Sequence, residues 1–415
     1  MRRVVITGIG AITPIGNTIE EYASGLRNGE SGSDYITHFD ASKFKTTFAC
    51  EVKNFDGEEI FGRKEVRKMD LFSQYGVVSA RQAVEDSGLD FEKEDVNRVG
   101  VIWGSGIGGL RSLEEQIEIN SDYENNPRYN PFMIPKMIAD IVPGQISIEF
   151  GLRGINYGTI SACASSSHAI INALDSIRIG RADIIVTGGS EAAVTRAGIG
   201  GFSGMKALSS RNDDPTTASR PFDKDRDGFV LGEGAGALVL EEYEHAVARG
   251  ATIYAEVLGG GMTADAYHIT APHPDGLGAA NVMRYALEDA KISPDVIDYI
   301  NVHGTSTPLG DVAEIKAIQH VFGEKAYDLH ISSTKSMTGH LLGASGAIES
   351  IACLIAMKEG FIPPTINHFT DDPEIDDRLQ LTFNEAVKAD VNYALCNTFG
   401  FGGHNTSLIL KKLDA

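Results

Sequence analysis

The sequence contains few cysteines and no cysteine motif. Cys50, Cys163, Cys353 and Cys396 are the four among 415 residues, and no two of them show C-x-x-C spacing. This scatter excludes the common zinc clusters and argues against a disulfide framework. We therefore expect a reducing compartment and no bound metal.

Long apolar runs and an excess of basic charge are also absent. No stretch approaches the roughly 20 apolar residues of a membrane-spanning helix, and residues 1–7 enter a strand pattern without a signal-peptide hydrophobic region. Lys and Arg number 36 against 57 Asp and Glu, a net charge of −21, which opposes binding to nucleic acid or anionic lipid. We expect a soluble cytoplasmic protein that binds neither nucleic acid nor membrane.

Three familiar site motifs are missing or incomplete. The Gly-x-Ser-x-Gly turn of serine hydrolases is absent as a strand-turn-helix element. Residues 104–109 satisfy the dinucleotide fingerprint G-x-G-x-x-G, but a fold with glycine turns at many strand ends produces such matches by chance. Residues 223–228 begin like a calcium loop, yet position twelve is Gly234 and not a carboxylate. We expect no nicotinamide, flavin or calcium.

What the chain does contain is a weak internal repeat of strands. Four early strand patterns have later counterparts in the same order: 4–10 with 254–260, 100–106 with 299–305, 157–163 with 329–335, and 182–189 with 392–400. Helical patterns at 72–86, 169–179, 279–290 and 346–358 lie between them. Alternation of strands and helices predicts a layered α/β fold in two similar halves, 1–250 and 251–415, with reactive residues on turns where the halves meet.

One cysteine and two histidines stand in such turns. Cys163 follows a strand pattern and precedes a helical one, where the helix dipole and free backbone N–H groups favour a thiolate. His303 and His340 occupy glycine-flanked turns far downstream. Alone, each is more often a core residue than a catalytic one, so the argument depends on finding all three together.

Four motifs in order strengthen the case: Ser161-Ala-Cys-Ala-Ser-Ser, His303-Gly-Thr-Ser-Thr-Pro, Lys335-Ser-Met-Thr-Gly-His, and Asn397-Thr-Phe-Gly-Phe-Gly-Gly. This set resembles the β-ketoacyl-acyl carrier protein synthases, most closely the elongating type II enzymes of fatty acid synthesis. The resemblance covers essentially the whole chain, and residues 221–236 match a further family signature. It implies a duplicated thiolase-like fold of five layers, αβαβα, and a homodimer.

The resemblance also implies a decarboxylating Claisen condensation that lengthens an acyl chain by two carbons. Cys163 would carry the acyl group, and the backbone N–H groups of Cys163 and Phe401 would form an oxyanion hole. His303 and His340 would hydrogen-bond the thioester oxygen of a malonyl group as it loses carbon dioxide. Lys335 would supply positive charge. Its carboxylate neighbours would be Glu314 and Glu349, although a purely structural role is as plausible for Glu349.

Further residues match family positions that bind the substrate arm and chain. Thr305 and Thr307 match residues that hydrogen-bond pantetheine, and Phe401 matches an aromatic gate over the cysteine. Ile107 and Phe202 match positions in the acyl tunnel, where ordinary core packing is the alternative. No cofactor is implied, because the substrates carry phosphopantetheine on an acyl carrier protein.

Acyl carrier protein is acidic, so this acidic chain needs a local basic surface to bind it. The basic cluster of Arg63, Lys64, Arg67 and Lys68 has spacings that could share one helical face, and Lys206 matches another family contact. A solvated helix surface is the alternative reading.

Three related functions remain as alternatives. A thiolase would use a second cysteine, but Cys396 lacks the glycine run expected after it. A free-standing polyketide ketosynthase shares nearly all of the motifs. A non-catalytic chain-length factor lacks the nucleophile, whereas Cys163 is present. His404 stands where many relatives carry threonine, and the motifs assign it no role.

Overall fold

The computed structural model describes residues 1–122 and 127–413, and its largest element is an 11-stranded mixed sheet. The first half of the chain contributes β1 (Val4–Ile12), β4 (Val99–Gly104), β5 (Asn156–Thr159), β6 (Ile184–Glu191) and β7 (Gly234–Glu242). The second half contributes β8 (Ala255–Ala264), β9 (Tyr299–Asn301), β10 (His330–Ser332), β12 (Gln380–Leu381), β14 (Tyr393–Gly400) and β15 (His404–Lys411).

Strand order repeats between the halves. From one edge the order is β5-β4-β6-β7-β1, and from the other, after β12, it is β10-β9-β14-β15-β8. The two runs meet where β1 pairs with β8 through Val5–Glu256 and Ile6–Ala255. Each strand pair expected from the sequence repeat, such as 100–106 with 299–305, therefore occupies equivalent places in the sheet.

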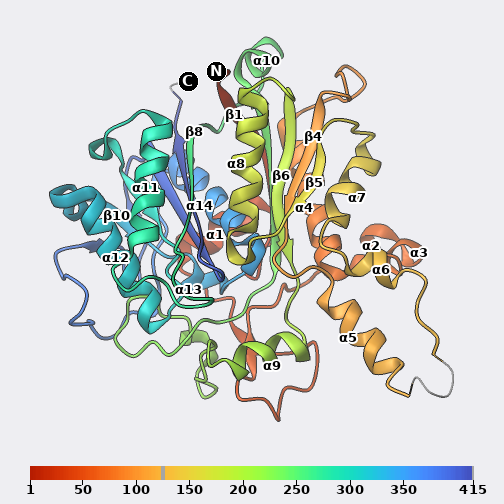
Figure 1. The fold of residues 1–415 in the computed structure, drawn as a ribbon, viewed down its shortest axis with the longest axis horizontal. Helices are drawn as coiled ribbons and strands as arrows, with labels where there is room; N and C mark the ends of the chain where they lie inside the picture. The colour runs from red at the N-terminus through yellow and green to blue at the C-terminus, as the bar shows by residue number, and fades with distance from the viewer. Residues whose placement is uncertain (123–126, 414–415) are drawn as a thin grey trace.

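Five layers run from left to right in Figure 1. Helices α11 (Leu277–Ala290) and α12 (Pro308–Phe322) cover the second-half strands, and α4 (Leu71–Ser87) and α7 (Ile141–Phe150) cover the first-half strands. Helices α8 (Ser165–Arg178) and α14 (Ser345–Glu359) lie between the two sets of strands. The expected αβαβα architecture is confirmed.

The remaining helices are peripheral or short. They are α1 (Ile19–Asn28), α2 (Gly57–Phe61), α3 (Arg63–Val66), α5 (Leu110–Ile119), α6 (Met133–Met137), α9 (Arg196–Gly204), α10 (Tyr243–Ala248) and α13 (Lys335–Thr338). Short strand pairs also form between β2 (Asp34–Tyr35) and β3 (Phe48–Ala49) and between β11 (Phe361–Ile362) and β13 (Val387–Lys388). Within the ranges described, we find no helix with the length and apolar content to cross a membrane.

The long helices differ in what fixes their ends. Asp70 caps α4 by accepting a hydrogen bond from the Phe72 N–H at 3.3 Å, and Gly88 ends it in the left-handed region at φ 64°. The central helices α8 and α14 lack side-chain caps of this kind. Instead their first turns meet, and the Ala347 N–H donates to Ser166 Oγ at 3.0 Å. The N-termini of the two buried helices are thereby held side by side.

Candidate active site

Cys163 lies at the junction of strand and helix that the sequence predicts. It occupies the short 3-10 turn Ala162–Ala164 between β5 and α8, and only 6% of it is exposed. Ala162 has φ 50°, a left-handed conformation that is uncommon for a residue with a side chain. Leu342 has φ 46° in the equivalent turn, Leu342–Ala344, before α14. The same strained entry into a central helix thus occurs in both halves.

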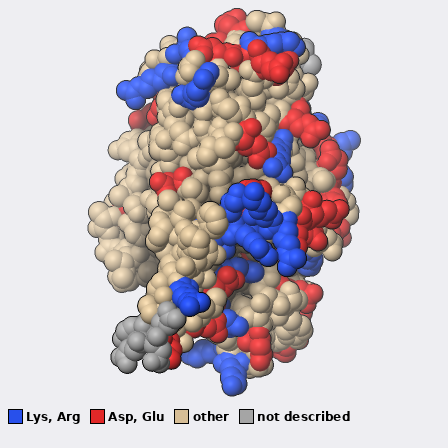
Figure 2. Space-filling model, turned by 90° about the vertical axis from the view of Figure 1, so that its right-hand side faces the viewer, with Lys and Arg blue, Asp and Glu red and all other residues tan. Residues whose placement is uncertain are grey.

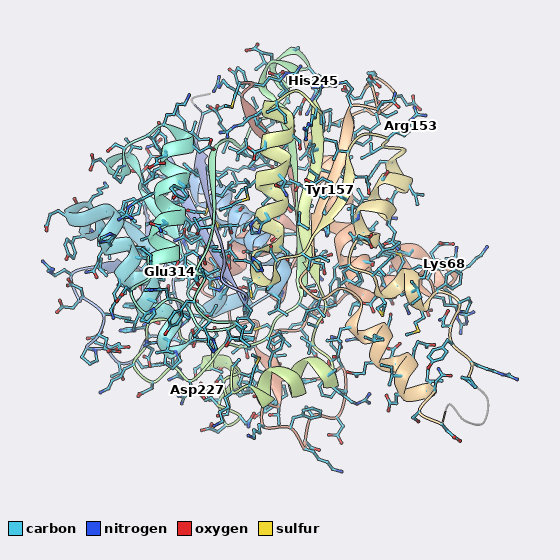
Figure 3. All side chains as sticks on the ribbon, viewed as in Figure 1. Lys68, Arg153, Tyr157, Asp227, His245 and Glu314 are labelled. Carbon is cyan, nitrogen blue, oxygen red and sulfur yellow. The ribbon has the colours of Figure 1, made fainter. Side chains whose placement is uncertain are left out.

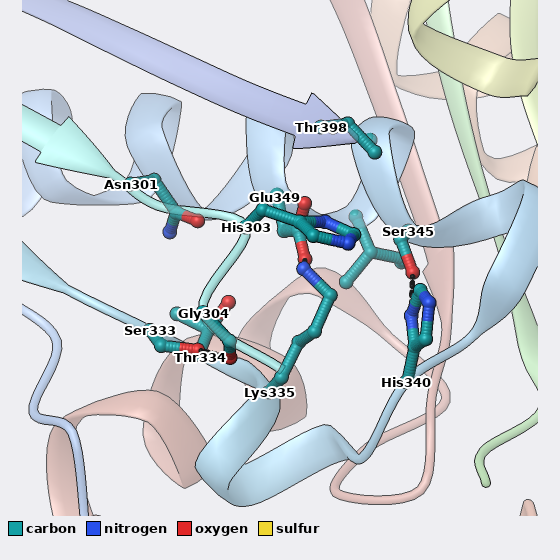
Figure 4. A network of polar contacts seen from close by, with 12 residues as sticks. Asn301, His303, Gly304, Ser333, Thr334, Lys335, His340, Ser345, Glu349 and Thr398 are labelled. Carbon is teal, nitrogen blue, oxygen red and sulfur yellow. Dashed lines mark hydrogen bonds and ion pairs between the residues drawn. The ribbon is translucent and has the colours of Figure 1, made fainter. Parts of the chain in front are cut away.

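His340 contacts the cysteine directly. Its Nε2 lies 3.0 Å from Cys163 Sγ, and its Nδ1 lies 3.0 Å from Ser345 Oγ (Figure 4). A hydroxyl both donates and accepts, so Ser345 can satisfy Nδ1 in either tautomer of the neutral ring. The ring can therefore accept a proton from the thiol or donate one to a substrate oxygen through the same Nε2.

Two opposing effects act on the pKa of Cys163. The main-chain N–H groups of Phe401 and Cys163 do lower its pKa, as does Lys335. Burial acts more strongly in the opposite direction and raises the pKa of the thiol to about 12. The main-chain N–H groups thus act in the expected direction, but desolvation of the sulfur outweighs them.

His303 completes a cluster of three reactive side chains. It follows β9, and its ring centroid lies 5.3 Å from that of His340. Glu314 on α12 fixes this turn by accepting hydrogen bonds from the N–H groups of His303 at 2.9 Å and Gly304 at 2.8 Å. Burial, reinforced by Lys335, holds the pKa values of both histidines well below the ordinary value. Both rings are neutral at physiological pH.

Lys335 is buried at the start of α13 and pairs with Glu349 on α14, and Figure 4 shows its side chain reaching Glu349 beside His303. Burial raises the pKa of Glu349 to about 7, while the lysine opposes that shift. A solvated surface lysine is therefore excluded, and Glu349 is in contact with the site. Glu314 feels the charge of Lys335, which lowers its pKa against the larger effect of burial, while its hydrogen bonds go to the His303 turn and Asn397.

Cys163, His303 and His340 line a cavity of about 390 Å³, and Glu314 also belongs to its wall. Its wall also contains residues that the motifs predict: Phe202, Lys206, Thr305, Thr307, Phe399 and Phe401. Ile107 does not lie in this wall, and 39% of its surface is exposed in the single chain. Its place in an acyl tunnel stays a prediction.

Residues 265–273 form part of the cavity wall that sequence reasoning missed. Asp265, Thr270 and His273 line the cavity, although no motif marks them. The Gly402 N–H donates to Ile269 O at 2.7 Å, and the Asp265 N–H donates to Gly403 O at 2.9 Å. Only these tertiary contacts show that the segment supports the Phe401 turn.

The Phe401 turn requires glycine. Gly402 and Gly403 have φ 89° and 74°, in the region that side chains disfavour. The turn joins β14 to β15 and carries Phe401 over Cys163 at the cavity wall. A gating role for Phe401 remains a prediction.

The predicted basic cluster is exposed but less regular than expected. Arg63, Lys64 and Arg67 are exposed, and α3 is a single turn that ends at Val66. Lys68 forms an ion pair with Glu65 at 2.7 Å, which neutralises part of its charge. Figure 3 shows Lys68 on the right side of the molecule, and Figure 2 shows basic side chains gathered on that same side.

The glycine-rich loop after β4 is already filled by a carboxylate. Glu191, fully buried on β6, accepts hydrogen bonds from the N–H groups of Gly106 at 2.7 Å and Ile107 at 3.1 Å. It also accepts from the Gly343 N–H at 3.0 Å. An internal carboxyl group thus occupies the backbone donors that a phosphate would need, so this loop is not a free dinucleotide site.

Metal binding has no obvious site. In the two described segments, no group of three or more His, Cys, Asp or Glu side chains is arranged to hold a metal ion. The absence of a cofactor stays a prediction.

Comparison with known proteins assigns the family. Family models for the N-terminal and C-terminal domains of β-ketoacyl synthase match residues 1–246 and 254–369. The 3-oxoacyl-[acyl-carrier-protein] synthase 2 of Synechocystis sp. is 50% identical over 411 residues, which span 99% of this chain and 98% of that protein.

Solved structures agree. A β-ketoacyl synthase from Burkholderia phymatum has a TM-score of 0.92 and 37% identity, with complete coverage of both chains. A type II polyketide ketosynthase in complex with its acyl-carrier protein has a TM-score of 0.91 and 34% identity, again with complete coverage. The chain therefore belongs to the β-ketoacyl synthase family.

Proposed function

We propose that this enzyme, an acyltransferase with the activity of a 3-oxoacyl-[acyl-carrier-protein] synthase 2, elongates acyl chains by a decarboxylating Claisen condensation at Cys163. The observation that carries the proposal is the meeting of Cys163, His340 and His303 in one cavity, with Lys335 buried beside them. This arrangement provides a nucleophile and two neutral hydrogen-bond donors for an enolate.

Acyl transfer comes first. The sulfur of Cys163 attacks the carbonyl carbon of an acyl thioester, a new C–S bond forms, and the bond to the carrier sulfur breaks. His340 Nε2, 3.0 Å from Sγ, accepts the thiol proton and returns it to the departing carrier sulfur. A protonated resting thiol requires such a base. The N–H groups of Cys163 and Phe401 stabilise the oxyanion of the tetrahedral intermediate.

Condensation follows on a malonyl thioester. The bond to its carboxylate breaks, carbon dioxide leaves, and the electron pair becomes an enolate whose oxygen accepts hydrogen bonds from His303 and His340. The enolate carbon then attacks the acyl carbonyl on Cys163. The cysteine sulfur departs and takes up a proton from water, and a β-ketoacyl thioester remains on the carrier.

No cofactor is needed for these steps. Neutral imidazoles can donate hydrogen bonds to the enolate oxygen without transferring a proton to it. The nearby Lys335 adds a positive electrostatic potential at the site. Its pairing with Glu349 reduces the cost of burying the ammonium group.

Acyl carrier protein is the proposed partner. The polyketide ketosynthase of similar structure was solved in complex with its own acyl-carrier protein. In this chain Arg63, Lys64, Arg67 and Lys206 are exposed, and Lys206 also lines the cavity. These residues provide local positive charge for an acidic carrier on a chain whose net charge is −21.

A homodimer is proposed from the open edge of the sheet. Strand β5 is the last strand on one side, and its Tyr157 is exposed at the front of the molecule in Figure 3. Ile148, Ile160 and Phe132 are also exposed. Figure 2 shows a broad surface with few charged side chains next to the basic group. An unpaired strand edge surrounded by apolar groups is stabilised by pairing with a second copy.

A cytoplasmic location is part of the same proposal. All four cysteines are free and buried, as in proteins of reducing compartments.

Intact-protein mass spectrometry tests the reaction. The enzyme is mixed with a medium-chain acyl carrier protein and then with malonyl carrier protein, beside Cys163→Ser. We expect the acyl mass on the wild type alone, then its loss together with formation of β-ketoacyl carrier. Absence of acyl transfer at every chain length would refute the proposal, and turnover restricted to polyketide intermediates would instead assign a polyketide ketosynthase.

A further inference from the structure

The segment 223–228, which resembles an incomplete calcium loop, packs against the turn that carries Thr305 and Thr307. Arg226 lies at the centre of this contact, and only 3% of its side chain is exposed. Its Nε donates to Thr307 O at 3.1 Å, and its Nη2 donates to Pro308 O at 2.9 Å. A buried guanidinium therefore holds two consecutive carbonyl groups of a distant turn.

Carboxylates and a carbonyl of its own segment hold the guanidinium in place. Nη1 of Arg226 donates to Asp223 O at 2.7 Å and to Asp372 Oδ2 at 2.6 Å. Asp311 Oδ2 on α12 lies 3.4 Å from Arg226 Nε. The planar fork thus has a defined orientation, which a lysine ammonium could not reproduce.

The same segment restrains the residue between the two threonines. Ser306 has φ 65°, an unfavourable conformation for a residue with a side chain. Its carbonyl accepts from the Gly228 N–H at 3.1 Å, and its hydroxyl accepts from the Arg220 N–H at 3.0 Å. With these bonds in place, the hydroxyl oxygens of Thr305 and Thr307 lie 3.0 Å apart at the cavity wall.

We propose that Arg226 is a positioning residue for the pantetheine arm: by fixing the carbonyls of Thr307 and Pro308 it aims the hydroxyls of Thr305 and Thr307 into the cavity. The inference rests on the proposed function, in which this turn binds the arm. It assigns to the 223–228 segment a role in substrate binding in place of calcium binding.

Arg226→Lys tests the inference, with Arg249→Lys as the matched control. Arg249 is also a partly buried arginine that binds a buried carboxylate, Glu241, and a main-chain carbonyl, Ser87 O, and it does not line the cavity. We expect Arg226→Lys to raise the KM for carrier-bound substrates roughly tenfold, the size of one lost hydrogen bond, with kcat within twofold. Arg249→Lys leaves KM unchanged.

Alkylation of Cys163 by iodoacetamide separates positioning from general damage, because this small reagent has no pantetheine arm. Its rate should stay within twofold of wild type in Arg226→Lys. A parallel fall in alkylation rate and in kcat, or an unchanged KM, would overturn the inference. If Arg226→Lys does not fold, Asp311→Asn is measured instead, with the same expected direction in KM.

A double-mutant cycle gives the decisive comparison. Replacement of both Thr305 and Thr307 by valine should raise KM, and Arg226→Lys should then add little, because it acts through those hydroxyls. Additive effects would overturn the inference while leaving the proposed condensation intact. If the valine variants keep the wild-type KM, the turn does not bind pantetheine through these hydroxyls, and the proposed role of Arg226 is refuted as well. Failed acylation of the wild type would instead refute the proposed function.

Discussion

At the scale of single residues, the two histidines have different contacts, so replacing each one should affect different steps of the reaction. His340 touches Cys163 Sγ and Ser345, whereas His303 lies beyond it, beside Phe399. His340 is therefore placed to act in both half-reactions, and His303 in condensation alone.

His303→Ala should still form the acyl-enzyme at close to the wild-type rate. Condensation should fall by roughly 10²–10³-fold, the effect of removing one donor from a developing oxyanion. Single-turnover acylation and decarboxylation of malonyl carrier protein measure the two steps, with exposed His320→Ala on α12 as the control. Equal loss of both steps would contradict this division of roles.

The protonation state of Cys163 gives a prediction of pH dependence. Burial raises the pKa of its thiol to about 12, so the thiolate fraction increases about tenfold per pH unit throughout the range below that value. The rate of alkylation by iodoacetamide should therefore rise steadily from pH 6.5 to 9.5, with Cys163→Ser as the blank. A plateau beginning near neutral pH would show instead that the free enzyme holds a thiolate and an imidazolium.

At the scale of elements, the two central helices depend on close approach of their entry turns. Gly343, in the turn before α14, donates its N–H to Glu191, which also binds the loop after β4. A Cβ at position 343 would lie 2.2 Å from Gly106 N and 2.7 Å from Glu191 Oε2. These neighbours are main chain and a fully buried side chain, so they have little room to move.

Gly343→Ala should lower the midpoint of thermal unfolding by about 1–4 °C, because the overlap costs about 1–3 kcal/mol and a chain of 415 residues unfolds with an entropy of roughly 0.9 kcal/mol/K. Gly201→Ala is the control, since Gly201 lies in α9 with no atom within 4 Å of the added Cβ. Differential scanning fluorimetry measures both variants. Equal midpoints would mean that the turns can separate without cost.

At the scale of the whole molecule, strong negative charge and a local basic surface act in opposition. Lys64→Glu on α3 should raise the KM for acyl carrier protein several-fold at low ionic strength, and the difference from wild type should narrow near 0.5 M salt as screening increases. Lys316→Glu on α12, on the opposite side in Figure 1, makes the same change of charge elsewhere. An equal effect of both variants would contradict docking at α3.

The architecture was largely predictable from the chain. The strand repeat predicted equivalent places for 100–106 and 299–305, which became β4 and β9 in the sheet. The helical pattern at 72–86 became α4, Leu71–Ser87, with its ends set by a capping aspartate and a glycine. Periodicity and caps are local properties, so they can be read without knowledge of the packing.

Contacts between distant segments were not predictable in the same way. No local signal indicates that Cys163 lies against His340, that residues 265–273 close the cavity, or that Glu191 fills the glycine-rich loop. The raised pKa of Cys163 was hidden for the same reason, because the helix terminus is visible in the sequence and the desolvation of the thiol is not.

The sequence by itself thus determined the duplicated α/β architecture, the family and the reactive residue types, since these depend on patterns and motifs along the chain. Only the tertiary structure decided the burial that raises the pKa of Cys163, the contact of His340 with that thiol, and the clamp of Arg226 on the turn of Thr305 and Thr307. Burial and hydrogen bonding between segments tens to hundreds of residues apart set these properties, and they exist only once the chain has folded.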